Sequence, residues 1–257
     1  EPQIHPTAVV APSAVVGEGC VVGAAAVIGP HVVLGTGVTV GASAIIEGHT
    51  TIGDHCRIFP FASVGQAPQD LKYRPGTVSF LEIGEDTVVR ECATANTASD
   101  EGATTSIGRN CLLMAYTHVA HNVRLGDHVI LANGVLLAGH VTVDDRAFIS
   151  GNCLLHQFVR VGRLALMQGG SAITKDLPPY CMARDVNHLC GLNTVGLRRA
   201  GIPGEERMEL RRLYHALFRG RRSWKESLAA ARAEFGGAPA LALIERSEEH
   251  TSELQSP

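Results

Sequence analysis

The chain has 257 residues, enough for one large domain or two modest ones, and its formal net charge of −3 gives no whole-chain signal for nucleic-acid binding. Hydrophobic residues make up 45% of the sequence but aromatic residues only 5%, so Val, Ile, Leu and Ala must build the core. No apolar run reaches the ~18 residues that a membrane-spanning helix needs. The seven cysteines include no CxxC pair, and an odd number cannot pair fully, so we expect a reducing, cytoplasmic compartment.

From the N-terminus onward, an aliphatic residue returns every six positions, as in "VVAPSAVVGEGCVVGAAAVIG" over 9–29. The register runs from Val10 to Val64, returns at Ile83, and continues unbroken from Ile107 to Ile173. A small or β-branched residue follows each aliphatic one by four positions, and four cysteines take this slot: Cys20, Cys56, Cys111 and Cys153. This period predicts a parallel β-helix, in which three hexapeptides close one triangular coil of 18 residues.

The repeat is interrupted at about 66–82 and 96–106, where we expect loops expelled from the coil. It ends after Pro178–Pro179. Helical spacing then appears in 203–220, a second helix starts at Ser223 with a capping box, and a third is expected over 239–245.

The predicted domains are therefore a β-helix over 1–190 and a helical cap over 191–245. The stretch "RSEEHTSELQSP" (246–257) resembles the read-through of a sequencing adapter, so we expect it to be a non-native tail.

Three histidines fall on one corner of such a coil. Positions 18 apart lie above one another, so His121 stacks under Gly139 and then Gln157, while His140 and His156 lie within one residue of that column. Surface histidines are tolerated on any solenoid, and three imidazoles could also hold zinc. However, these three rise along a column rather than converge on a point, which favours a proton-transfer site.

The motifs "QDLKY" (69–73), "HVAHN" (118–122), "HQF" (156–158) and "NTVGLRRAG" (193–201) resemble the UDP-N-acetylglucosamine O-acyltransferases, which catalyse the first step of lipid A synthesis. The likeness extends over nearly all of 1–235. It implies a left-handed coil, a homotrimer with active sites between subunits, and transfer of a 3-hydroxyacyl chain from acyl carrier protein to the sugar 3-position. No cofactor, metal, nucleic acid or membrane span is expected.

The resemblance also implies roles for individual residues. His121 would be the general base, and the amide of Gly139 would stabilise the oxyanion. Gly169 would stand at the position that sets acyl-chain length, with room for long chains. Substrate contacts would come from Gln69, Asp70, Lys72, His118, His140, His156, Gln157, Asn193 and Arg199, with Asp70 and Lys72 reaching in from an adjacent subunit.

Two positions depart from the family pattern. Asn122 stands where an Asp usually follows the catalytic His, and Asn96 stands where a substrate-contacting His is usual. An Asn can hydrogen-bond the imidazole but cannot stabilise its cation by charge. Because Asn96 changes the sugar-contacting side, the acceptor could be a 3-hydroxyl or a 3-amino sugar nucleotide.

Between Arg198 and Lys225 there are nine basic residues against three acidic ones. Such a patch suits an acidic partner such as acyl carrier protein, although a solvated helix face would look the same. The other functions left open are a different hexapeptide acyltransferase, including the N-acyltransferase that acts later in the pathway, and a non-catalytic scaffold.

Overall fold

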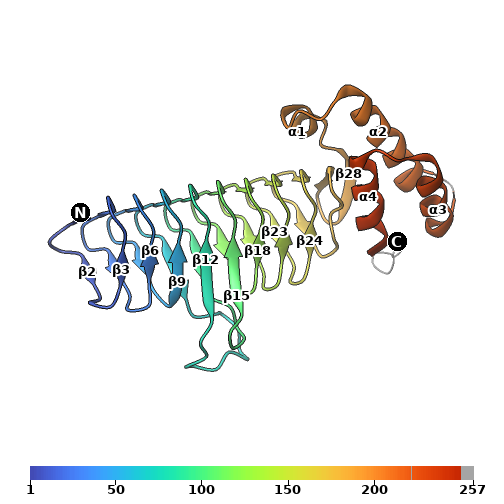
Figure 1. Ribbon diagram of the computed structural model, residues 1–257. Coiled ribbons are helices and arrows are strands. Elements are labelled where there is room, and N and C mark those ends of the chain that lie inside the picture. Colours follow the sequence, from blue (N-terminus) through green and yellow to red (C-terminus); the bar gives the residue numbers. More distant parts are fainter. Residues whose placement is uncertain (221, 250–257) are drawn as a thin grey trace.

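The computed structural model describes residues 1–220 and 222–249, and it is a left-handed parallel β-helix with helices at its C-terminal end (Figure 1). The chain winds around a three-sided prism, so that each side is one parallel sheet. We call the sides sheets A, B and C, in the order in which the chain visits them, and we name each edge by the two sheets it joins.

The strands are mostly two residues long, because each hexapeptide must also supply a corner. Sheet A contains β1 (Gln3–Ile4), β4 (Val21–Val22), β7 (Thr39–Val40), β10 (Arg57–Ile58), β13 (Val88–Val89), β16 (Leu112–Leu113), β19 (Ile130–Leu131), β22 (Phe148–Ile149), β25 (Leu166–Met167), β27 (Cys181–Arg184) and β28 (His188–Leu192). Sheet B contains β2 (Val9–Val10), β5 (Val27–Ile28), β8 (Ile45–Ile46), β11 (Ser63–Gln66), β14 (Thr94–Asn96), β17 (His118–Val119), β20 (Leu136–Leu137), β23 (Leu154–Leu155) and β26 (Ala172–Ile173). Sheet C contains β3 (Val15–Val16), β6 (Val33–Leu34), β9 (His49–Ile52), β12 (Phe80–Ile83), β15 (Thr104–Ile107), β18 (Arg124–Leu125), β21 (Thr142–Val143) and β24 (Arg160–Val161).

The strand register confirms the predicted coil. Val21 pairs with Thr39 and His118 pairs with Leu136, each 18 positions further along the chain. The second residue of most strands points inward and is buried, as at Ile46 and Leu137, while the first residue faces outward. Stacked hexapeptides of one pattern thereby build a continuous aliphatic core, and the buried aromatic residues Tyr180, Tyr214 and Phe235 lie beyond the end of the repeat.

Two coils are longer than 18 residues, and both extra segments leave the prism at the BC edge. Arg57 pairs with Val88 and Val88 pairs with Leu112, which are separations of 31 and 24 positions. The extra residues form loops at 67–79, between β11 and β12, and at 97–103, between β14 and β15. Both project from the side of the prism (Figure 1). They are shorter than the interruptions at 66–82 and 96–106, because the adjoining strands extend into them.

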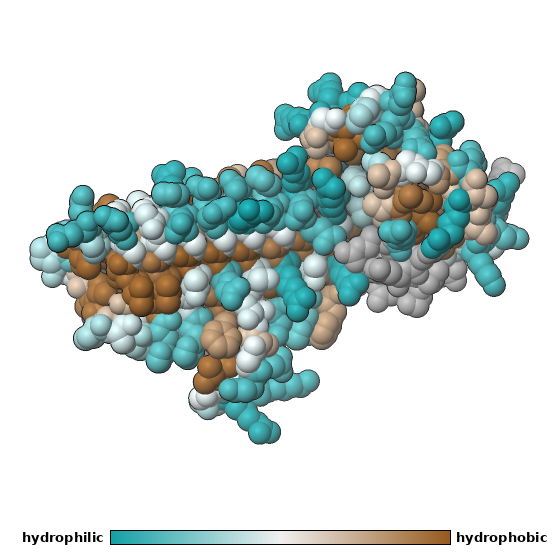
Figure 2. Space-filling view, viewed as in Figure 1, coloured by the Kyte–Doolittle hydropathy of each residue, from teal (hydrophilic) through white to brown (hydrophobic). Residues whose placement is uncertain are grey.

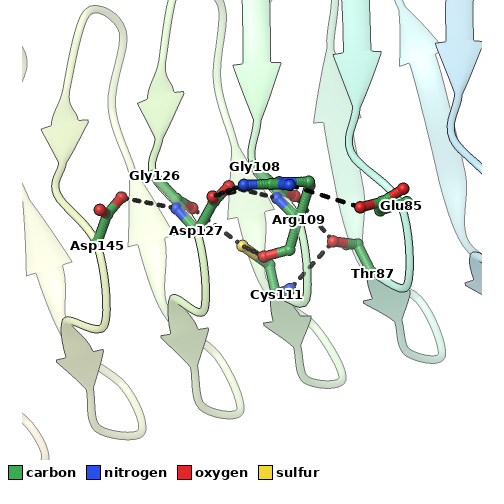
Figure 3. A network of polar contacts seen from close by, with 8 residues as sticks. All are labelled: Glu85, Thr87, Gly108, Arg109, Cys111, Gly126, Asp127 and Asp145. Carbon is green, nitrogen blue, oxygen red and sulfur yellow. Dashed lines mark hydrogen bonds and ion pairs between the residues drawn. The ribbon is translucent and has the colours of Figure 1, made fainter. Parts of the chain in front are cut away.

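The CA edge, in contrast, is closed by a ladder of carboxylates (Figure 3). The second residue after each sheet C strand has an amide N–H that no strand pairing uses. The Arg109 amide donates to Asp127 Oδ1 at 2.8 Å, and the Asp127 amide donates to Asp145 Oδ1 at 2.9 Å. Arg109 also pairs with Asp127 at 2.8 Å and with Glu85 at 3.6 Å. Asp127 and Asp145 therefore each cap the turn of the preceding coil.

The four cysteines in the small-residue slot are buried thiols, as the repeat predicted. Each thiol lies near a backbone carbonyl of a neighbouring turn, as Cys111 Sγ does at 3.1 Å from Gly126 O. Burial raises the pKa of Cys56 and of Cys111 to about 11. The four thiols are core filler, because all of them are buried in the small-residue slot of the repeat.

The C-terminal end closes with a β-hairpin and helices. β27 continues sheet A beside β25 and then pairs antiparallel with β28. The helices are α1 (Thr194–Arg199), α2 (Gly204–Phe218), α3 (Trp224–Glu234) and α4 (Ala238–Glu249). α3 starts with the predicted capping box between Ser223 and Glu226. α4 runs beyond the predicted 239–245 to Glu249, inside the expected tail, and residues 250–257 lie outside the described part of the chain.

Candidate active site

The candidate site lies on the BC edge, on the coils that follow the two expelled loops. His121 follows β17, Gly139 and His140 follow β20, and His156 and Gln157 follow β23, so all five belong to successive turns of one edge. The His121 and His140 rings meet edge-on with centroids 5.2 Å apart. Phe158 stacks on the other face of His140 at 4.7 Å. The repeat alone therefore gathers these side chains.

The imidazole of His121 lies directly over Gly139. A Cβ atom added at Gly139 would be 2.5 Å from His121 Nε2 and nearer still to Cε1. Only glycine can occupy this place without moving the ring. The Gly139 amide N–H also has no acceptor within the described residues, whereas the equivalent amides of Arg109 and Asp127 on the CA edge are capped by carboxylates. The site thus has a free N–H donor beside the imidazole.

Asn122 fixes the tautomer of His121. The Asn122 oxygen Oδ1 accepts the backbone N–H of Ser99 at 3.0 Å, and this donor identifies the atom as oxygen rather than nitrogen. The same oxygen is 2.9 Å from His121 Nδ1, so Nδ1 must carry the proton. Nε2 is then left with a lone pair, which is the form a general base needs.

His118 and His140 flank this base. His118 faces outward from β17, and its Nδ1 lies 2.7 Å from Thr94 Oγ1 on the previous coil. Burial, followed by the charge of His121, lowers the pKa of both His118 and His140 below the ordinary 6.5. Both rings are therefore neutral near pH 7, and they line the site without adding a charge to it.

The 67–79 loop brings a carboxylate to the site. Asp70 Oδ2 lies 3.9 Å from His121 Nε2 of the same chain, so a neighbouring copy is not needed for this contact. The Lys72 amide donates to Asp70 Oδ1 at 2.9 Å, which fixes the turn, while the Lys72 side chain is exposed. Asn96 holds the loop's base, because its amide donates to Gln66 O at 3.2 Å and to Ala67 O at 3.0 Å. Asn96 is buried, so its side chain contacts the base of the loop and does not face an open cavity.

Two hollows flank the edge. On the sheet B side, a cavity of about 340 Å³ is lined by His118, His121 and Gly139, by Gln69 from the loop, and by the exposed leucines Leu136 and Leu154. On the sheet C side, a polar hollow of about 780 Å³ is lined by residues that include Asn122, His140, Arg124 and Arg160. An apolar chain fits the first lining and a polar group fits the second.

The remaining predicted residues lie away from the imidazole of His121. His156 and Gln157 are exposed on the next turn, where His156 Nδ1 is 3.2 Å from the Gln157 carbonyl. Gly169 lies on the AB edge, beside Gly151.

Asn193 and Arg199 belong to the cap, where both line a cavity of about 340 Å³ between α1 and sheet A. Asn193 is buried, because its side chain accepts from Gly196 N at 2.9 Å to cap α1 and donates to Leu164 O at 2.9 Å.

The histidines do not converge on a metal position. Within residues 1–220 and 222–249, no group of three His, Cys, Asp or Glu side chains is placed to hold one ion. Among the same residues, no helix has the length and hydropathy to cross a membrane.

Two family profiles match the chain. Residues 176–253 match the second domain of UDP N-acetylglucosamine O-acyltransferase, and residues 104–139 match the bacterial transferase hexapeptide, six repeats. An acyl-(acyl-carrier-protein)–UDP-N-acetylglucosamine O-acyltransferase of Anaeromyxobacter sp. is 47% identical over 91% of this chain and 91% of its own length. The chain belongs to the acyl-(acyl-carrier-protein)–UDP-N-acetylglucosamine O-acyltransferase family.

A second relative of this O-acyltransferase family, from Myxococcus xanthus, is 47% identical over 91% of this chain and 92% of its own. The UDP-N-acetylglucosamine acyltransferase structure from Campylobacter jejuni superposes with a TM-score of 0.89, at 36% identity, over 95% of each chain. The predicted family is thus confirmed, and the protein is an acyltransferase.

Four further residues that were not among the predicted ones shape the site of this O-acyltransferase: Thr94, Ser99, Asp100 and Thr105. Ser99 and Asp100 lie in the 97–103 loop. The sequence of this loop is polar, and no pattern in it indicates that these two residues contact Asn122. Thr94 could have been found from the repeat, because β14 pairs with β17 and Thr94 is opposite His118.

Proposed function

We propose that the protein transfers a 3-hydroxyacyl chain from acyl carrier protein to the 3-hydroxyl of UDP-N-acetylglucosamine, the step that begins lipid A synthesis, with His121 as general base. The observation that carries this proposal is the Nδ1–H tautomer of His121 imposed by Asn122, next to the free amide of Gly139. A base and an oxyanion donor side by side are what acyl transfer requires.

In the proposed reaction, the sugar 3-oxygen attacks the thioester carbonyl carbon while His121 Nε2 accepts its proton. The Gly139 N–H donates to the resulting oxyanion. The C–S bond then breaks, and the departing thiolate of the carrier takes the proton back from Nε2. Atoms and charge balance without a metal or redox cofactor.

The acyl chain and the nucleotide would bind in different cavities. The leucine-lined cavity beside His121 would receive the acyl chain, and Gly169 would be where its far end is limited. Gln69, Asp70 and Lys72 would contact the sugar and phosphates, together with His118, His140, His156 and Gln157. The cap cavity lined by Arg199 and Asn193 would receive the nucleotide, and in that case Asn193 acts mainly by shaping α1.

We propose further that the protein is a homotrimer and lies in the cytoplasm. Acyl carrier protein would dock on the basic cap. The outer faces near the N-terminus are unusually apolar for surfaces in contact with water, as the brown area toward the N-terminal end in Figure 2 shows. The exposed residues include Val9, Val15, Val21, Val33 and Ile45, and Leu71 at the tip of the expelled loop is fully exposed. Val15 and Val33 lie on neighbouring strands of sheet C, and exposed apolar surface of this kind favours burial against further copies.

The test is an acyl-transfer assay with purified protein, acyl carrier thioesters of defined length, and both the 3-hydroxyl and the 3-amino sugar nucleotides. His121→Ala should lower kcat by at least about 1,000-fold, since it removes the base from the transition state. Its circular dichroism should match the wild type. Substantial turnover by a folded His121→Ala protein, or use of the amino sugar alone, would contradict the proposal. Preference for ten-carbon over fourteen-carbon donors would contradict the roomy acyl slot.

A further inference from the structure

We propose that Asp100, on the second expelled loop, is a positioning residue for His121 and acts through the amide of Asn122. This inference rests on the proposed role of His121 as general base. It concerns how a chain with a neutral Asn beside that histidine still provides a negative charge on the Nδ1 side of the ring.

The contacts form a relay of three residues. His121 Nδ1 is 2.9 Å from Asn122 Oδ1, and the other end of the same amide, Nδ2, donates to Asp100 Oδ2 at 3.3 Å. Because Nδ1 carries the proton, it donates to Asn122 Oδ1, and Asn122 Nδ2 in turn donates to Asp100. Both hydrogen bonds therefore point from the imidazole toward the carboxylate. An amide polarised by a carboxylate at its nitrogen is a stronger acceptor at its oxygen. The negative charge is therefore displaced by one residue rather than lost.

Ser99 holds the relay in register. Its backbone N–H donates to Asn122 Oδ1 at 3.0 Å, and its hydroxyl, 2.9 Å from Asn122 Oδ1 and 3.0 Å from Asp100 Oδ2, shares its one proton between these two acceptors. The Asn122 backbone is fixed independently, since its N–H donates to the buried Thr105 hydroxyl at 2.8 Å. Asn122 also has a positive φ of 59°, a conformation that Asn tolerates better than most residues. A side chain clamped at both ends cannot flip its amide.

Other charged or titratable groups also face His121. Asp70 approaches the Nε2 side from the 67–79 loop at 3.9 Å, where substrate is proposed to bind. His118 and His140 are imidazoles with lowered pKa and add no negative charge. Asp100 is thus the carboxylate that acts on the Nδ1 side, where it does not compete with substrate. Its effect is to favour the imidazolium that forms as the sugar hydroxyl loses its proton.

The experiment compares four proteins with the wild type, measuring kcat and KM for both substrates across pH. Asp100→Asn removes the charge but keeps the shape and an acceptor oxygen. Glu101→Gln is the matched control, because this adjacent carboxylate accepts from Val78 N at 3.0 Å and does not contact Asn122. The exchange Asp100→Asn with Asn122→Asp returns a carboxylate to the His121 side. His121→Ala reports on the proposed function itself.

We expect Asp100→Asn to lower kcat by about three- to tenfold with both KM values nearly unchanged. The acid limb of its pH profile should move to lower pH, since a negative charge near the base is gone. Glu101→Gln should behave as the wild type, and the exchanged pair should recover most of kcat.

If Asp100→Asn has wild-type kcat and pH profile while His121→Ala is inactive, the positioning role is overturned and the proposed function stands. The positioning role is also overturned if Glu101→Gln loses as much kcat as Asp100→Asn, because the effect would then come from the general charge of the loop. If His121→Ala stays active, the general-base assignment and the positioning role fail together.

Discussion

The CA and BC edges of the prism are built from the same hexapeptide, yet one is closed and the other is open. On the CA edge, amides two residues past a strand are capped by carboxylates from the next coil, as the Arg109 amide is by Asp127 and the Asp127 amide is by Asp145. On the BC edge, the corresponding next-coil residue above His121 is Gly139, which has no side chain to cap anything. The missing side chain leaves space for the His121 imidazole, and the Gly139 N–H stays free within the described part of the chain because Gln157, on the next coil, does not accept from it. Stability and reactivity thus depend on which side chain occupies one repeated position.

Among the substitutions that test this contrast, Gly139→Ala should have the largest effect on kcat. Its methyl group would displace the His121 ring, and a misplacement of about 1 Å can reduce turnover roughly 100-fold. We expect kcat to fall by at least that factor while the thermal midpoint changes little, because the ring borders an open cavity. Steady-state assays together with circular dichroism melts check both quantities.

Gly126→Ala is the matched substitution on the closed edge. Its Cβ would collide with Asp145 Oδ1 and come within 2.8 Å of Asp145 N, so the ladder itself must shift. Here the melting temperature should fall and kcat per folded molecule should remain. If both glycine variants lose the same property, the distinction between the edges is wrong.

A second contrast concerns pH. The folded-state pKa values of His118 and His140 are lowered, first by burial and then by His121. The unfolded chain therefore takes up protons near pH 6.5 while the folded edge resists them, so the free energy of unfolding should decrease as pH falls from about 7.5 to about 5. His118→Asn keeps a polar partner for Thr94 and should make the decrease shallower. An unchanged slope in urea melts of this variant would show that the open edge does not resist protonation.

The smallest expected effect is on the closed edge. Arg109, through its side-chain hydrogen bond, holds the pKa of Asp127 below its ordinary 3.8, so the stabilisation is present above that pH and is lost as pH falls through the lowered value. Asp127→Asn should cost about 0.5 kcal/mol at pH 7, because the pair is partly exposed, and should leave kcat unchanged. The difference from wild type should shrink as pH falls below 3.8. A loss that persists in acid would point to packing rather than charge.

The repeat made most of the fold and the core of the site predictable. A fixed period of six specifies the sheets, the inward side chains and the stacking of His121 with Gly139, since every coil copies the one below. Helix α1 and the β27–β28 hairpin could not be read this way, because they follow the end of the repeat and depend on tertiary contacts such as the hydrogen bond from Asn193 to Leu164 O. The contact of Ser99 and Asp100 with Asn122 was likewise invisible, because a loop expelled from the coil has no register to indicate where it returns.

The most direct test of the catalytic claim is a crystal structure of the protein with UDP-N-acetylglucosamine. We expect the sugar 3-hydroxyl oxygen within about 3 Å of His121 Nε2, with Nδ1 still bonded to Asn122, and with the Gly139 N–H facing the open space beside that oxygen. A sugar whose 3-hydroxyl faces His118 or His140 instead, or a His121 ring turned so that Nε2 meets Asn122, would contradict the assignment of His121 as the base.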